Sequence, residues 1–250
     1  MESIFSIILW FLIGIFAGFL SGMFGIGGGS VRTPLVYASG LPLLSAFGIN
    51  LLVIPFSSCI AAISHRKNID WRFAPYVVIG GILGSVAGAF LVGMIQTLIL
   101  AIIFLFVSLL TIFGIYLDRL IPRAAKKIHP HKQSIISGTF LLNFITAMRG
   151  GSGGTLFPPF LKLMKLDIHK AIATSLFATI FSAIAGVVIY WYRGDIILLP
   201  AVVVIVGSVV GARIGSLISL KTKSLWLEIG LSVFVIVMAL IVLVKAILIK

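Results

Sequence analysis

The sequence has little charge and few residues suited to a water-facing surface. Of its 250 residues, 10% are charged and 60% are hydrophobic, with a mean hydropathy of +1.25. A soluble domain has roughly 25% charged residues, so this composition indicates a polytopic membrane protein. The first apolar stretch, Ile4 to Leu20, has no basic residue before it and no clean cleavage site. We therefore interpret it as a membrane span rather than a signal peptide.

Cysteine and acidic residues are scarce. The one cysteine, Cys59, excludes a disulfide framework and a thiolate metal site, and its apolar neighbours predict a buried core residue. The six acidic residues lie in expected loops or termini, apart from Glu228, which begins the last apolar run and is expected to be interfacial. A proton relay of acidic side chains within the membrane is therefore disfavoured.

Catalytic motifs are missing as well. There is no His-Glu-x-x-His motif, no pair of aspartates and no supported Ser/His dyad, which disfavours intramembrane proteolysis and metal-dependent chemistry. His65 and His169 border predicted loops and are expected to be interfacial. We expect no catalytic residue, no metal site, no cofactor and no enzymatic activity.

The net charge of +13 comes from Lys and Arg residues in short clusters between apolar runs. Such clusters are typical of membrane topology signals rather than of nucleic-acid surfaces. We therefore expect the lipid bilayer and a small anionic substrate as partners and no nucleic acid. Monomer and homodimer both stay open.

The two halves of the chain match at an offset of 125 residues. The matched pairs are Ser21/Thr146, Met23/Met148, Gly25/Gly150, Gly28/Gly153, Gly29/Gly154, Ser30/Thr155, Pro34/Pro159, Ala46/Ala171, Asn50/Ser175, Asp70/Asp195 and Pro75/Pro200. At an offset of 123, "GSVAGA" (84–89) matches "GSVVGA" (207–212). The sequence therefore predicts a duplication within one membrane domain. Its parts are a first repeat (1–117), a basic cytoplasmic linker (118–132) and a second repeat (133–250).

Each half shows the same series of segments. An apolar run is followed by a glycine loop, a short proline-containing segment and three further apolar runs. The apolar runs are 4–21, 45–64, 73–93, 97–117, 133–148, 171–190, 196–218 and 224–244, and the short segments are 30–41 and 154–166. A membrane-spanning helix needs roughly 20 residues, so the short segments are predicted to be broken or re-entrant. The predicted fold is all-α, with four long transmembrane helices and one such segment in each repeat.

Matched loops of the two halves differ in charge. The loop 65–72 is more basic than its partner, whereas 162–170 and 219–224 are basic and their first-half partners are not. Because basic loops face the cytoplasm, we predict inverted repeats. The segments 65–72, 118–132, 162–170 and 219–224 would then be cytoplasmic and both termini outside, in a multi-pass protein of the cell membrane.

The glycine loops are the candidate site. The first is "GMFGIGGGSVRTP" (22–34), which matches "AMRGGSGGTLFPP" (147–159). Two helix breaks at matching positions of inverted halves point to the central site of a transporter. Glycine permits close approach of a ligand, and free N–H groups before a helix favour an anion. Neither loop has the spacing of a phosphate-binding or dinucleotide-binding loop. Close helix packing through small residues is the alternative, and it is the favoured interpretation for 84–89 and 207–212.

Three arginines, Arg32, Arg149 and Arg213, lie in or near the predicted membrane region, and their matched positions hold phenylalanine. A cation there usually faces a cavity or a partner. A planar guanidinium suits sulfonate or carboxylate oxygens, so Arg149 first and Arg32 second are expected to contact an anionic substrate. For Arg213, snorkelling or pairing with a helix carbonyl is an equal alternative.

The candidate substrate-binding residues are the two arginines, the loop residues and one polar residue after each short segment. They are Arg149, Arg32, Gly27, Gly28, Gly29, Ser30, Gly150, Gly151, Ser152, Gly153, Gly154, Thr155, Asn50 and Ser175. Asn50 and Ser175 are expected to line the cavity or to cap and join helices. Asn143 and Thr146 are weaker candidates.

The doubled stretches "SGMFGIGGGSVRTPLV" and "TAMRGGSGGTLFPPFL", followed by "SAFGINLLV" and "KAIATSLFA", resemble the sulfite exporter TauE/SafE family of membrane permeases. The resemblance covers essentially the whole chain. It implies export or uptake of small anions, typically sulfur-containing ones such as sulfite, sulfoacetate, thiosulfate or related organosulfonates. The loop residues that it places around the site are Gly25, Gly27, Gly28, Gly29, Pro34, Gly150, Gly153, Gly154 and Pro159.

These features together predict a secondary transporter, an exporter of small sulfur-containing anions that works by alternating access at a mid-membrane site formed by both loops. The alternatives are an anion channel-like conduit and a non-transporting membrane scaffold or assembly factor. The identity of the anion, the direction of transport and the coupling ion stay open.

The predicted topology is testable with a reporter fused after Lys250. We expect the reporter outside the cell, because both termini are predicted there and the basic loops inside. Activity of paired alkaline phosphatase and fluorescent protein fusions measures the location. A cytoplasmic reporter would contradict the topology.

Overall fold

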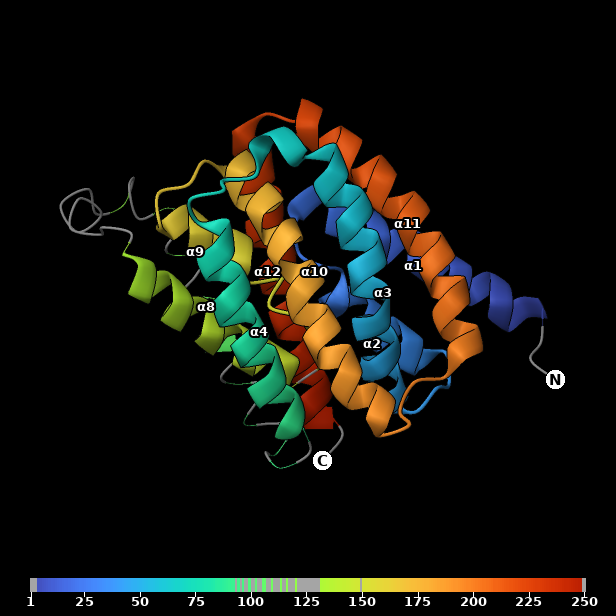
Figure 1. The fold of residues 1–250 in the computed structure, drawn as a ribbon. Helices are drawn as coiled ribbons and strands as arrows, with labels where there is room; N and C mark the ends of the chain where they lie inside the picture. Colours follow the sequence, from blue (N-terminus) through green and yellow to red (C-terminus); the bar gives the residue numbers. More distant parts are fainter. Residues whose placement is uncertain are drawn as a thin grey trace.

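The protein is a bundle of helices in the computed structural model, which describes residues 4–92, scattered positions between 94 and 120, residues 131–148 and residues 150–248 (Figure 1). The helices are α1 (Ile4–Phe24), α2 (Gly29–Ala38), α3 (Leu43–Ser64), the 3₁₀ turn η1 (Arg66–Asn68), α4 (Ala74–Phe90), α8 (Lys132–Ala147), α9 (Phe157–Leu163), α10 (Ile168–Tyr192), α11 (Leu198–Lys221) and α12 (Ser224–Leu248). Four of them, α1, α3, α10 and α11, are long and apolar enough to cross a membrane. The prediction of an all-α polytopic membrane protein is confirmed.

Two helices are shorter than a membrane span. α4 is also shorter than the predicted run 73–93, whereas α8 has the length of the predicted run 133–148. α4 has 17 residues and α8 has 16, fewer than the roughly 20 that cross the hydrocarbon. α8 ends shortly before the second glycine loop. α4 begins at Ala74, and Pro75 lies in its first turn. The two short segments are the helices α2, with 10 residues, and α9, with 7, so their shortness is confirmed. The predicted span 97–117 and linker 118–132 lie mostly outside the described residues.

Glycines set the closest helix contacts. α1 packs along α11 and α4 packs along α8, so each contact joins one half of the chain to the other. A Cβ atom added at Gly211 would lie 2.0 Å from the carbonyl oxygen of Ile15, and one at Gly84 would lie 2.4 Å from that of Phe140. These positions have room only for hydrogen, which confirms the packing interpretation of the two matched GSV-x-GA motifs.

Matched helices run in opposite directions in Figure 1. α3 rises toward the upper end of the view and its match α10 descends, while α4 descends and its match α11 rises. α3 and α10 contact each other between the two close seams. These directions support the predicted inverted repeats, which stay a prediction here.

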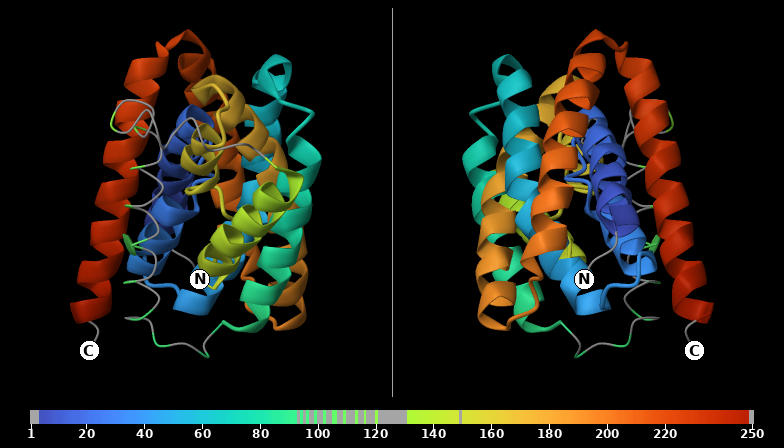
Figure 2. Two further views of the ribbon diagram at one scale, coloured as in Figure 1. Left: turned by 90° about the vertical axis from the view of Figure 1, so that its left-hand side faces the viewer. Right: turned by 90° about the vertical axis from the view of Figure 1, so that its right-hand side faces the viewer.

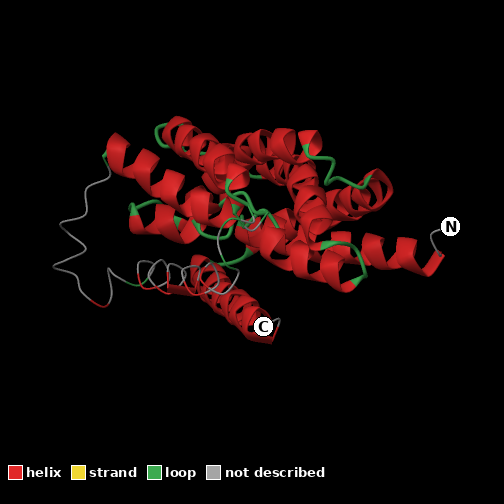
Figure 3. Cartoon of the chain, turned by 90° about the horizontal axis from the view of Figure 1, so that it is seen from below, coloured by secondary structure: helices red, strands yellow, loops and turns green. Residues whose placement is uncertain are grey.

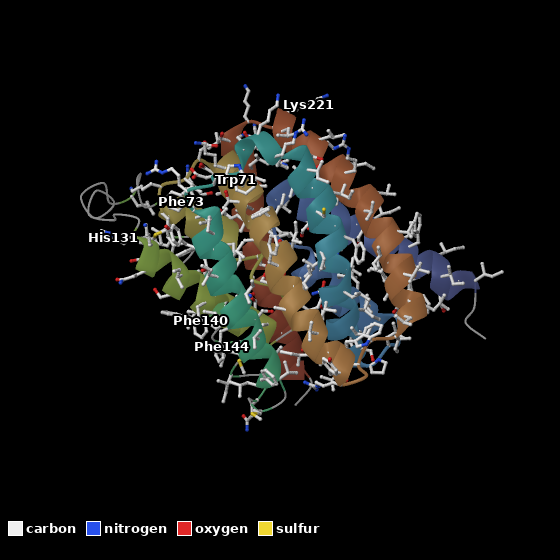
Figure 4. All side chains as sticks on the ribbon, in the orientation of Figure 1. Trp71, Phe73, His131, Phe140, Phe144 and Lys221 are labelled. Atoms are coloured by element: carbon white, nitrogen blue, oxygen red, sulfur yellow. The ribbon has the colours of Figure 1, made fainter. Side chains whose placement is uncertain are left out.

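The two ends of the bundle differ in chemistry. Trp71 lies at the same end as Lys221 (Figure 4), the end at which the basic turn 219–224 joins α11 to α12 (Figure 2). The exposed aromatic residues Trp191 and Tyr192 lie at the C-terminal end of α10, at the opposite end. Aromatic residues at both ends are typical of membrane–water interfaces.

Seen from below in Figure 3, α12 lies beside the other helices, and it contacts α1 and α10.

The outer faces of the long helices carry exposed apolar side chains. Cys59 lies on such a face of α3 and is exposed, so the prediction of a buried cysteine is wrong. The physical reason is that lipid is as apolar as a protein core. An apolar sequence context therefore does not distinguish the two surroundings.

Substitution of Gly211 by alanine tests the seam between α1 and α11. We expect a loss of stability of about 1–3 kcal/mol, the usual effect of overpacking, because the new Cβ meets a backbone carbonyl that cannot move alone. The apparent melting temperature in detergent measures it. The neighbouring substitution Val210→Ala is the control, since Val210 is 43% exposed on the outer face; equal melting temperatures of the two variants would contradict the prediction.

Candidate site at the two glycine loops

The two glycine loops touch each other inside the bundle. A Cβ atom at Gly154 would lie 2.5 Å from the carbonyl oxygen of Ile26, and one at Gly27 would lie 3.6 Å from Oγ of Ser152. Among the described loop residues, 25–29 and 152–155 are buried and Gly151 is half-buried, while the side chain of Ser30 lies outside the described part. The structure therefore brings together the two loops that the sequence placed 125 residues apart.

The backbone of the loops requires glycine at matched positions. Gly25 and its match Gly150 have φ values of 73° and 68°, and Gly28 and its match Gly153 have 73° and 70°. This left-handed region is costly for residues with a Cβ atom. The two loops thus share their backbone conformation at these two matched pairs, whereas Gly27, with a φ of 68°, is matched by Ser152, whose φ is not positive.

Asn50 and Ser175 hold the loops of the opposite halves. Nδ2 of Asn50, on α3, donates to the carbonyl oxygen of Gly150 at 2.6 Å, and Oγ of Ser175, on α10, donates to that of Gly25 at 2.8 Å. Both side chains are fully buried. The two hydrogen bonds correspond to each other, because Asn50 matches Ser175 and Gly150 matches Gly25 at the offset of 125 residues. Each bond fixes one loop to the other half of the chain.

Arg32 is the buried cation of the site. Its side chain, on α2, is 0% exposed. Nη1 donates to Oδ1 of Asn50 at 2.7 Å and to the carbonyl oxygen of Gly27 at 3.5 Å, and Nη2 donates to Oγ of Ser208 at 3.2 Å. Nε has no hydrogen-bond partner. Arg32 forms no ion pair with any acidic residue that the structure describes.

Within the described chain, the charge of Arg32 is therefore held by neutral groups alone. An isolated charge in an apolar interior is expensive unless a charged partner compensates it. Nε–H and the second hydrogen of Nη2 remain for a further acceptor, and together they form one edge of the guanidinium fork. That edge matches two oxygens of a carboxylate, sulfonate or sulfite.

The start of α2 adds a second feature that favours an anion. α2 begins at Gly29, within the predicted first loop, and directly follows the left-handed residues of that loop. Its N-cap residue, Gly28, provides no side-chain cap. The first N–H groups of a helix have no intrahelical acceptor and carry the positive end of the helix dipole. At the matched position of Arg32, by contrast, the second half has the fully buried ring of Phe157. Among the described residues of the loops, the cation is on one side only.

The second loop is fixed by its own polar residues. Thr146 accepts a hydrogen bond at Oγ1 from the amide of Gly153 at 2.8 Å and donates to Asn143 at 3.2 Å. Asn143 in turn donates to the carbonyl oxygen of Gly81 on α4. These residues were weaker candidates in the sequence, and the structure places them as supports of the loop.

Sequence reasoning missed two serines at the loops. Ser208 accepts from Arg32 and donates to the carbonyl oxygen of Gly14 at 3.1 Å, and Ser182 donates to that of Ser152 at 3.4 Å. Ser208 lies in the GSVVGA motif, which offered a signal, because it is the one hydroxyl in that otherwise apolar stretch. Thr155 is buried at the end of the second loop. Arg149 lies outside the described residues, so its role stays a prediction.

Three further ionisable residues of the described chain lie outside the two loops in sequence. Arg213 is exposed and donates to Ser64 at 2.6 Å, near the C-terminal end of α3. His65 was expected to be interfacial and is fully buried. This burial, and to a smaller extent the charge of the nearby His169, lowers the pKa of His65 to about 4. Glu228 was also expected to be interfacial, yet it is 4% exposed and pairs with Lys162 of α9 at 3.0 Å. In both cases a helix from elsewhere in the chain covers a residue that begins or ends a span.

Fold and site together define a multi-pass membrane protein with a polar, partly cationic centre built from two broken segments, the class to which membrane transporters belong. The chain belongs to the Sulfite exporter TauE/SafE family, whose model matches residues 10–242. It is similar to the "Probable membrane transporter protein" of Haemophilus influenzae, with 28% identity over 93% of this chain and 96% of the relative. It is also similar to "Probable membrane transporter protein YunE" of Bacillus subtilis, with 27% identity over 88% and 90%. No solved structure matches the chain.

Alanine at Gly28 tests the requirement for glycine in the first loop. Its Cβ atom would lie 2.8 Å from Nη2 of Arg32 and 2.9 Å from the carbonyl oxygen of Ala17, in addition to the strain of φ 73°. We expect lower thermal stability and displacement of Arg32. Gly194→Ala is the matched control, since Gly194 has φ 75° and nothing within 4 Å of an added Cβ, so it carries the strain of about 1–2 kcal/mol alone. Melting temperatures of both variants measure the difference, and equal losses would show that the contacts are unimportant.

Proposed function

We propose that the protein is a secondary transporter that exports small sulfur-containing oxyanions, such as sulfite, sulfoacetate or another organosulfonate. The observation that carries the proposal is the fully buried guanidinium of Arg32, which pairs with no acid in the described chain and keeps Nε unpartnered. A bound monoanion would compensate this charge. The family name, which refers to sulfite, supports the sulfur-containing class.

The bound anion would lie between Arg32, the start of α2 and the two loops. The guanidinium edge takes two oxygens, and the amides at the start of α2 favour negative charge. Arg149 is proposed as a second contact from the other loop. Neutral partners such as Asn50 and Ser208 hold Arg32 in place without cancelling its charge.

Alternating access would proceed by movement of one group of helices against another around this site. The opposite directions of matched helices support inverted repeats, which would give an inward-facing and an outward-facing state of similar structure. We further propose that the basic end of the bundle is cytoplasmic and both termini are outside. An inside-negative potential of 100 mV would then favour export of a monoanion by about 2.3 kcal/mol.

Flux measurements on proteoliposomes test the role of Arg32. We expect Arg32→Gln to lower the initial rate of sulfite and sulfoacetate transport roughly tenfold or more, the effect of losing one hydrogen-bonded charge pair. Arg213→Gln is the control, because Arg213 is exposed and bonded to Ser64 away from the loops; its rate should equal that of the parent protein.

Three results would contradict the proposal. A folded Arg32→Gln variant that transports at the parent rate removes Arg32 from the site. A rate that rises linearly with anion concentration without saturation favours a channel-like conduit. No flux in the parent protein with any of the anions favours a scaffold whose glycines only pack helices.

A further inference from the structure

Asn50 joins the buried cation to the opposite glycine loop through one amide group. Its Oδ1 accepts from Nη1 of Arg32 at 2.7 Å, and its Nδ2 donates to the carbonyl oxygen of Gly150 at 2.6 Å. The side chain is fully buried, and Gly29 packs so closely that a Cβ atom there would lie 2.7 Å from Nδ2. Arg32, Asn50 and the second loop thus form a continuous chain of hydrogen bonds.

The matched residue Ser175 performs only half of this task. It donates to the carbonyl oxygen of Gly25 at 2.8 Å, as Asn50 does to Gly150. The position matched to Arg32 holds Phe157, so the corresponding place in the other half has no cation to bind. A serine would therefore suffice for holding a loop. The second polar atom of Asn50 serves its contact with Arg32.

A bound anion and Asn50 attract the same guanidinium from different sides, since the free edge of Nε and Nη2 would face the anion while Nη1 donates to Oδ1 of Asn50. Both partners accept charge-assisted hydrogen bonds, but only the anion adds the Coulomb attraction between two full charges, which is strong in a buried site. When an oxyanion binds Arg32, the guanidinium is drawn toward it and Oδ1 of Asn50 loses its strongest donor. The same amide then loses the contact that fixes its orientation toward Gly150, so the hold on the second loop weakens.

We propose that Asn50 is a positioning residue that couples anion binding at Arg32 to release of the second glycine loop. This inference rests on the proposed function, in which the anion binds Arg32. In the empty protein the Arg32–Asn50–Gly150 chain keeps the loops together and slows the change between the two access states. In the loaded protein the chain is broken and the change is faster, because the anion binds preferentially to the released state.

A comparison of exchange with net efflux tests this coupling. In proteoliposomes loaded with radiolabelled sulfite, exchange against external sulfite needs only loaded transitions, whereas net efflux also needs the return of the empty protein. We expect exchange to exceed net efflux by about tenfold in the parent protein, the factor for one hydrogen bond to a charged group. Asn50→Ser replaces two separate polar atoms by one shorter hydroxyl, so that a side chain donating to Gly150 no longer offers Arg32 a second atom as acceptor. It should bring the ratio close to one.

Two further variants separate coupling from a merely structural role. Ser175→Ala removes the matched loop bond without touching Arg32, so exchange and net efflux should change by the same factor. Asn50→Asp places a carboxylate against Arg32 and removes the donor to Gly150. It should abolish the rise in melting temperature that sulfite causes, while the protein without sulfite remains folded.

The outcomes distinguish the two proposals. If Arg32→Gln transports normally, the proposed function fails. If Arg32→Gln is inactive but the parent shows equal exchange and net efflux, or Asn50→Ser keeps the parent ratio, the coupling by Asn50 is overturned alone. A normal sulfite response of Asn50→Asp would show that the anion does not need the charge of Arg32, and it overturns the proposed function together with the coupling that rests on it.

Discussion

A guanidinium buried in apolar surroundings needs compensation, and among the residues that the structure describes Arg32 obtains it from neutral groups only. Asn50, Ser208 and the carbonyl of Gly27 come from α3, α11 and the first loop, and they accept its hydrogen bonds without neutralising it. A carboxylate in any of these places would make the site self-sufficient, and an anion would gain little there. The arrangement keeps the positive charge and fixes its position at the same time.

The glycine loops make this arrangement possible at the centre of a membrane bundle. Their left-handed residues turn the chain out of α1 and into α2, so that the beginning of a helix lies in the interior instead of at its surface. Chain that is not helical at this depth needs hydrogen-bond partners from the protein. Asn50 and Ser175 provide them for carbonyl groups of the opposite loops. The position of each loop therefore depends on one polar side chain from the opposite half of the chain.

The duplication made much of the site predictable. The offset of 125 residues identified both loops, and the pair Asn50 and Ser175 occupies matched places in space as in sequence. The sequence alone does not show which distant residues pack against a given side chain. The burial of His65 and of Glu228, the exposure of Cys59 and the contact of Ser208 with Arg32 are all decided by helices distant in the chain. Hydropathy is equal for a lipid-facing and a buried apolar position, so it could not separate them.

The close seams between α1 and α11 and between α4 and α8 have a consequence for the origin of the fold. Each seam takes one helix from each half, so neither half alone contains either of the two seams. A polypeptide with the length of one half would leave both faces of close backbone approach uncovered. Two identical copies placed antiparallel would cover these faces. Each copy would then hold the glycine loop of the other by a hydrogen bond, as Asn50 and Ser175 do here. A self-associating ancestor of half the present length satisfies the same packing, and fusion of its two copies then allows one half to acquire a positive charge where the other keeps an aromatic ring.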